Sequence, residues 1–168
     1  AGDGYEIQHK SDPLNPNDKP VTGMGFAWVR RGGDRNADWA SDIVTDADGN
    51  SYVIGSYEGK VEFEGGAMFS SKGGSDVFVM KFDTNGIIKW ATSFKGRFDD
   101  YASSISLSKD GHLLVSGIYG FHKTRTYRGK HTLQIGNKIL PSGSGSGSAF
   151  IAKLDANANG AVVWAHGF

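Results

Sequence analysis

Residues 38–57 read DWASDIVTDADGNSYVIGSY, and residues 100–119 read DYASSISLSKDGHLLVSGIY. When the two stretches are aligned, Gly49 falls on Gly111 and Gly55 falls on Gly117. Each copy alternates apolar and polar residues on both sides of an Asp-Gly turn, which is typical of two strands joined as a hairpin. A sequence that repeats at this spacing indicates a fold built from repeated supersecondary units.

A second pair of strands completes each copy. The segment DVFVMKFD, residues 76–83, matches SAFIAKLD, residues 148–155, and Trp90 matches Trp164. We therefore predict four strands in each unit, and the second unit has a longer excursion between its second and third strands. The predicted strands are residues 40–46, 51–57, 76–83 and 87–94 in the first unit and 102–108, 113–119, 149–155 and 161–168 in the second.

The remaining sequence precedes the first unit. GFAWVRR, residues 25–31, resembles a fourth strand that lacks its first three partners, and residues 1–24 are polar and show no period. The predicted organisation is therefore an irregular arm at 1–24, a leading strand plus the first repeat at 25–94, and the second repeat at 95–168. No segment predicts a helix.

Composition excludes several function classes. The 168 residues hold 18 Lys and Arg against 18 Asp and Glu, so a generally basic nucleic-acid binder is disfavoured. There is no Cys, which excludes disulfides, thiolate nucleophiles and Cys-ligated metals. No apolar run is long enough to span a membrane as a helix, and we expect any secretory signal to have been removed already.

The pattern D-x-A-x-x-I…D-x-D-G-N-x-Y-V-x-G, followed by G-G-S-D-x-F-V-x-K-F-D-x-N-G-x-x-x-W-A, resembles the SBBP repeat. That bacterial β-propeller repeat is common in secreted and cell-surface proteins. The resemblance implies an all-β fold of four-stranded antiparallel blades arranged radially, and a secreted or cell-surface location. It does not define one activity, because propellers host binding, scaffolding and catalysis.

Two repeats plus a leading strand form an incomplete propeller. Propellers usually have about four to eight blades, and a pair of blades leaves its outer faces uncovered. We therefore expect that the chain is a fragment of a longer repeat protein, or that a protein partner or further copies of the chain complete the ring.

Repeat-equivalent aromatic residues are candidates for ligand binding. Trp39 and Tyr101 each follow an acid, Asp38 or Asp100, in the connection that leads into the first strand of a unit. An aromatic face can stack on a sugar ring, and a neighbouring carboxylate can accept hydrogen bonds from its hydroxyls. The alternative is a structural role kept by the repeat. The tryptophans of the fourth strands are predicted to pack between blades.

Charge is unevenly distributed along the chain. Residues 1–84 hold 8 basic and 14 acidic residues, whereas residues 85–168 hold 10 and 4. The basic residues concentrate in the long excursion of the second unit, which is predicted to form an extended hairpin arm. This segment is a candidate site for a protein partner, an acidic glycan or lipopolysaccharide, and the alternative is a solvated loop of scattered charge. Its candidate residues are His122, Lys123, Arg125, Arg128, Lys130 and His131.

Catalytic and metal-binding motifs are poorly represented. Asp46-x-Asp48-x-Asn50 resembles the start of a calcium loop, but Tyr57 stands where a bidentate Glu is needed, so a capped hairpin turn is favoured. The five His include no metal-type pair, and there is no nucleophile elbow or phosphate loop. We expect no catalytic residue, metal or cofactor.

The sequence thus favours a non-enzymatic, secreted or cell-surface β-propeller module that acts as a structural or protein-interaction component of a larger bacterial assembly. The alternative is a lectin-like carbohydrate-binding propeller completed by oligomerisation. A propeller enzyme comes third.

Overall fold

The computed structural model describes residues 28–122, 131–141 and 147–168. Contacts divide the chain into two compact units, Ala1–Arg30 and Arg31–Phe168, and all ten strands lie in the second unit. The described residues contain no helix, as predicted, and therefore none that could cross a membrane. The predicted arm at 1–24 lies outside the described residues.

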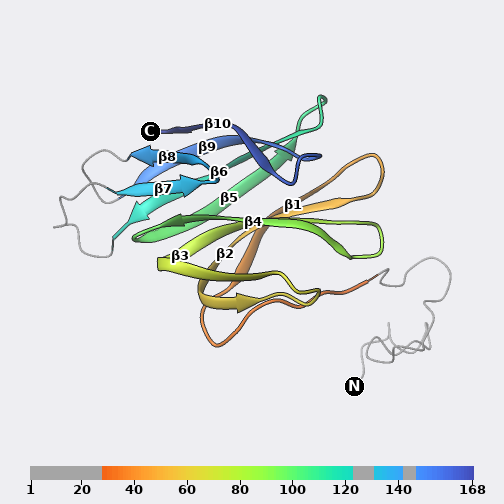
Figure 1. The fold of residues 1–168 in the computed structure, drawn as a ribbon, viewed down its shortest axis with the longest axis horizontal. Helices are drawn as coiled ribbons and strands as arrows, with labels where there is room; N and C mark the ends of the chain where they lie inside the picture. The colour runs from red at the N-terminus through yellow and green to blue at the C-terminus, as the bar shows by residue number, and fades with distance from the viewer. Residues whose placement is uncertain (1–27, 123–130, 142–146) are drawn as a thin grey trace, which may run out of the picture. The chain divides into compact units, whose positions relative to one another are not determined.

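The first repeat forms one four-stranded antiparallel blade (Figure 1). Its strands are β1 (Trp39–Thr45), β2 (Ser51–Glu62), β3 (Met68–Phe82) and β4 (Ile88–Gly96), and they lie side by side in chain order. β2 and β3 extend beyond the predicted ranges because their hairpin continues to a Gly65-Gly66 turn, where both glycines take a positive φ. We call this sheet the first blade.

The second repeat forms the second blade. Its strands are β5 (Asp99–Leu107), β6 (His112–Phe121), β9 (Ser148–Asp155) and β10 (Ala161–Gly167), and neighbouring strands are antiparallel. The predicted four-strand units are therefore found in both repeats. The two blades share one pairing register: Trp90 lies beside Lys81 in the first blade, and Trp164 lies beside Lys153 in the second.

A hairpin from the long excursion links the blades. β7 (Thr132–Ile135) and β8 (Lys138–Pro141) pair with each other, and β7 also pairs with β4, where Phe94 faces Ile135. The second repeat thus adds two strands to the sheet of the first. Leu133 and Ile135 are fully buried, so apolar burial holds the hairpin against the blades.

The predicted leading strand is not found in its described part. Residues 28–31 form no strand, and Gly32 makes only an isolated bridge with Phe63. Residues 25–27 lie outside the described residues.

The main hydrophobic core lies between the two blades. The first blade contributes side chains from β2, β3 and β4, and the second contributes side chains from β6 and β9. The packing role predicted for the fourth-strand tryptophans is confirmed for Trp90, whose Nε1–H donates a 3.1 Å hydrogen bond to the carbonyl oxygen of Ala156. It is not found for Trp164, which is only half-buried and lies outside the core between the blades. The two repeats therefore stabilise each other through this interface.

Candidate functional site

The structure brings the two predicted aromatic site residues together. The ring centroids of Trp39 and Tyr101 lie 5.7 Å apart, and those of Tyr101 and Phe121 lie 6.1 Å apart. Trp39 is 39% exposed and Phe121 is 37% exposed. These three side chains, which we call the aromatic row, come from β1, β5 and β6 and form a continuous series across the junction of the blades.

A small pocket adjoins the aromatic row at Phe121. Its volume is about 260 Å³, and both blades contribute to its walls. It combines aromatic rings with side chains of both charge signs. The lining residues are Glu58, Gly74, Arg97, Phe98, Asp99, Phe121 and His122.

Two acids of this pocket influence the hydroxyl of Tyr101 in the aromatic row. The pKa of the Tyr101 hydroxyl is raised, first by burial, then by the negative charge of Asp99 and to a smaller extent by that of Glu58. Asp99 is held in place, because its Oδ1 accepts a 3.1 Å hydrogen bond from the backbone N–H of Ser75. A Cβ at Gly74 would overlap that oxygen, so a larger residue there would displace the Asp99 carboxylate.

The two acids predicted to accompany Trp39 and Tyr101 take different positions. Asp38 is half-buried, and its carboxylate accepts hydrogen bonds from the backbone N–H groups of Asp34 at 3.0 Å and Glu58 at 3.4 Å. Asp100 is completely buried. The structure thus leaves Asp38 beside the aromatic row and removes the Asp100 side chain from solvent.

Asp100 forms a buried carboxyl pair with Asp76, which the sequence analysis missed. Asp76 accepts hydrogen bonds from the N–H groups of Lys72 and Gly96, and Asp100 accepts one from Gly120. Burial raises the pKa of Asp100 to about 9, and the neighbouring charge of Asp76 adds to the effect. The Asp76–Asp100 pair therefore retains a proton at a higher pH than an exposed carboxyl does.

The predicted basic partner site is only partly described. Lys123, Arg125, Arg128 and Lys130 lie outside the described residues. His131 is buried, and His122 is half-buried. Both imidazoles meet the ring of Phe98 edge-on, with centroids 4.9 Å away for His122 and 4.8 Å away for His131. The two histidines therefore pack against the same ring, Phe98, from the two sides of the 123–130 segment in the sequence.

The Asp-rich turn considered for calcium is closed by its own hydrogen bonds. The Asp46 carboxylate accepts bonds from the backbone N–H groups of Asp48 and Asn50, the amide of Asn50 and the hydroxyl of Tyr52. These contacts favour the capped-turn interpretation.

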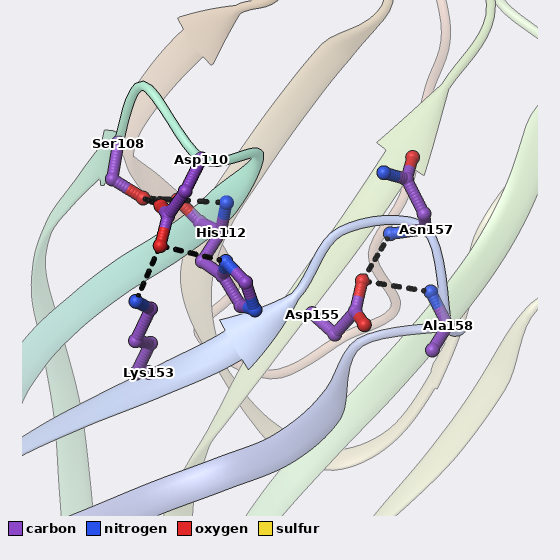
Figure 2. Close-up of polar contacts among 7 residues, drawn as sticks. All are labelled: Ser108, Asp110, His112, Lys153, Asp155, Asn157 and Ala158. Carbon is purple, nitrogen blue, oxygen red and sulfur yellow. Dashed lines mark hydrogen bonds and ion pairs between the residues drawn. The ribbon is translucent and has the colours of Figure 1, made fainter.

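Figure 2 shows the equivalent turn of the second blade, where the acidic side chain forms ion pairs. Asp110 bonds to Ser108, lies 2.8 Å from Lys153 Nζ and lies 3.2 Å from His112 Nδ1. The hydrogen bonds from Lys153 and Ser108 hold the pKa of Asp110 well below its usual value. Across the described ranges, no three His, Asp or Glu side chains gather as metal ligands would.

Comparison with known families bears on residues 27–56, which contain β1, its following turn and the first half of β2. These residues match the family model SBBP, described as a beta-propeller repeat. Residues 27–56 are therefore similar to part of an SBBP beta-propeller repeat. No curated protein matches the sequence significantly.

SBBP repeats suggest a structural or protein-interaction module and are typically non-catalytic. The second blade differs from the first in the burial of its fourth-strand aromatic side chains. Trp90 is buried between the blades, whereas the equivalent Trp164 is only half-buried. Phe94 is 0% exposed, whereas the equivalent Phe168 is 76% exposed. Within the described residues, no blade packs against the face of β6, β9 and β10 that points away from the first blade, whereas the equivalent face of the first blade packs against the second.

Proposed function

We propose that this chain is a non-enzymatic structural and protein-interaction module that associates with further copies of itself. In this proposal the outer face of the second blade, made by β6, β9 and β10, docks on the first blade of the next copy. The different exposure of Phe94 and Phe168 carries the proposal. The two side chains occupy the same register position, but Phe94 is buried between the blades and Phe168 is exposed.

The chemistry of the outer face supports this role. Ile118 on β6 is 40% exposed, and Trp164 and Phe168 add aromatic surface on the same side of the sheet. Contiguous exposed apolar groups mark interaction surfaces. At the interface between the two blades of this chain, the equivalent face of the first blade packs on the apolar side of the second blade, which supports a similar contact for the outer face.

Charge favours a second copy as the occupant. Residues 85–168 carry 10 basic and 4 acidic residues, and residues 1–84 carry 8 and 14. A head-to-tail arrangement places the basic half of one copy against the acidic half of the next, which favours association and fixes orientation. Repeated head-to-tail contacts close into a ring when the rotation allows, and two to four copies would supply about four to eight blades.

The proposal extends to location and assembly. The resemblance to repeats common in secreted and cell-surface proteins supports a secreted or cell-surface place for this module within a larger bacterial assembly. The basic segment that contains Lys123, Arg125, Arg128 and Lys130 is proposed as an additional contact for an acidic protein surface or glycan.

Light scattering on a sizing column tests self-association with the full chain. We expect a mass of two to four times 18.0 kDa, which falls toward the monomer at high salt. The double substitution Trp164→Ser with Phe168→Ser should give a folded monomer, as judged by circular dichroism. Ile139→Ser, which changes an exposed residue of β8, should leave the mass unchanged. A wild-type chain that stays monomeric at high protein concentration contradicts the proposal.

A further inference from the structure

We propose that the aromatic row and its adjoining pocket form a binding site for a neutral oligosaccharide. One sugar ring would enter the pocket beside Phe121, and the neighbouring rings would lie along Tyr101 and Trp39. This site lies within the two described blades, so it does not depend on the proposed self-association.

The aromatic row offers the apolar platform that a sugar ring requires. Trp39 is 39% exposed and Phe121 is 37% exposed, so both rings present apolar surface to solvent. Aromatic faces gain dispersion energy from the C–H bonds of a pyranose ring. Large exposed aromatic side chains that cluster on one surface mark a binding site more often than isolated ones do.

The polar groups of the pocket favour an uncharged ligand with many hydroxyls. Glu58 and Asp99 supply carboxylate acceptors, Arg97 supplies guanidinium donors, and His122 adds an imidazole. Sugar hydroxyls can donate to the carboxylates and accept from the guanidinium in one pose. A cationic ligand would meet Arg97, and an anionic ligand would meet both carboxylates, so the mixed charges disfavour each.

The site is largely preformed. The Ser75 N–H holds Asp99, and the absence of a side chain at Gly74 makes room for it. A Cβ at Gly73 would lie 2.0 Å from the carbonyl oxygen of Arg97, so β3 approaches the Arg97–Asp99 segment closely only because two consecutive glycines stand there. Preformed polar groups reduce the ordering cost of binding.

The size of the pocket sets how much of the ligand it encloses. Its volume of about 260 Å³ is below the range of roughly 300–1,000 Å³ that is usual for pockets enclosing whole small ligands. The pocket therefore suits one ring at the end of a chain, and the exposed aromatic row suits the rest. An oligosaccharide should bind more tightly than its monosaccharide.

A glycan array probed with the full wild-type chain is the first experiment. The array carries neutral glucan, xylan, mannan and galactan oligosaccharides, with sulfated and carboxylated glycans and a polylysine peptide as comparisons. We expect binding to one or more of the neutral oligosaccharides. Titration calorimetry with the strongest array ligand then gives the affinity, and quenching of tryptophan fluorescence reports contact with Trp39.

Two substitutions separate the platform from the polar contacts. Trp39→Ala should weaken binding of that ligand by about tenfold, because one sugar ring loses the aromatic face on which it stacks. Glu58→Gln should weaken it by several fold while leaving the fold unchanged, because Glu58 is exposed. Ile139→Ala on β8 is the matched control and should bind like wild type.

Three outcomes overturn the proposal: no binding to any neutral glycan, preference for charged glycans or polylysine, or binding that survives both substitutions at Trp39 and Glu58. Light scattering of the same variants keeps this test separate from the proposed self-association. A variant that loses sugar binding but keeps the mass of wild type supports the site. A variant whose mass changes while sugar binding stays intact bears only on self-association through the outer face of the second blade.

Discussion

The indole Nε1–H of Trp90 in the first blade donates a hydrogen bond of 3.1 Å to the carbonyl oxygen of Ala156 in the second blade. The contact also needs the glycine at position 160, because a Cβ there would lie 2.9 Å from the indole ring. Trp164 occupies the equivalent position in the second blade, and no blade covers it within the described residues. The repeat thus supplies a matched control for the interblade contact.

Substitution of these two tryptophans tests whether the blades stabilise each other. Trp90→Phe keeps an aromatic ring but leaves the Ala156 carbonyl without its donor, so we expect a loss of about 1–2 kcal/mol in the free energy of unfolding. Trp164→Phe should change that free energy by less than about 0.5 kcal/mol in the monomer. Urea denaturation at low protein concentration measures both. Equal losses would show that the interblade bond adds nothing to stability.

The Asp76–Asp100 pair predicts an unusual dependence of stability on pH. The Asp100 carboxyl has a pKa of 3.8 when unperturbed and of about 9 in the folded chain. Between these values the folded chain keeps a proton that the unfolded chain releases, so this group lowers stability progressively as pH rises from about 4 to 9.

Asp100→Asn removes that titration while keeping an uncharged side chain of similar size. The free energy of unfolding of the variant, relative to wild type, should therefore increase between pH 5 and pH 8, by at most about 1.4 kcal/mol per pH unit. Urea denaturation at several pH values provides the comparison. Asp48→Asn in an exposed turn is the control and should run parallel to wild type. If the free energy of unfolding of Asp100→Asn also changes with pH in parallel with wild type, the raised pKa of Asp100 is contradicted.

The β7–β8 hairpin should contribute strongly to stability although it lies outside the four-strand units. Leu133 is fully buried, so Leu133→Ala should cost about 2–5 kcal/mol through lost burial and the cavity left behind. Ile139 on β8 is 66% exposed, and Ile139→Ala should have little effect. Thermal unfolding followed by circular dichroism checks both variants. A small effect at Leu133 would mean that the hairpin detaches readily.

The turn after β1 provides a local test of capping. Asp46→Ala removes a carboxylate that accepts four hydrogen bonds from Asp48, Asn50 and Tyr52, and we expect a loss of about 2–3 kcal/mol. Asp48→Ala, in the same turn, removes an exposed side chain and should be nearly neutral. The midpoints of denaturant-induced unfolding of the two variants, compared with wild type, measure this difference in stability. Similar midpoints would refute the capping role of Asp46.

Strand positions depend mainly on local sequence, whereas strand boundaries depend on pairing with distant segments. The strands were predictable because alternating apolar residues and Asp-Gly turns act within a few positions of each other. The boundaries were less predictable: β2 and β3 run on to Gly65-Gly66 because pairing between the strands continues beyond the strongly alternating segments. Residues 28–31 resemble a strand in sequence but form none, since a strand also needs a partner.

The candidate site shows the same division. Trp39, Tyr101 and Asp38 were identifiable because the repeat places an aromatic residue after an acid in each unit. Phe121 and Glu58 belong to the site only because β2 and β6 reach the same junction between the blades. Asp100 follows the sequence pattern of Asp38, yet the first blade covers it with Asp76, whereas Asp38 stays half-buried.

The sequence by itself determined the repeated four-strand unit, the all-β class and the aromatic-acid pairs, because each depends on residues that are neighbours or near neighbours along the chain. Only the tertiary structure decided which of two equivalent residues is buried and which is exposed. Phe94 and Phe168 occupy the same position of their blades. Phe94 is covered by the second repeat, whereas Phe168 is exposed. Burial depends on what packs against a surface, and the sequence of one repeat does not specify which repeat packs against it.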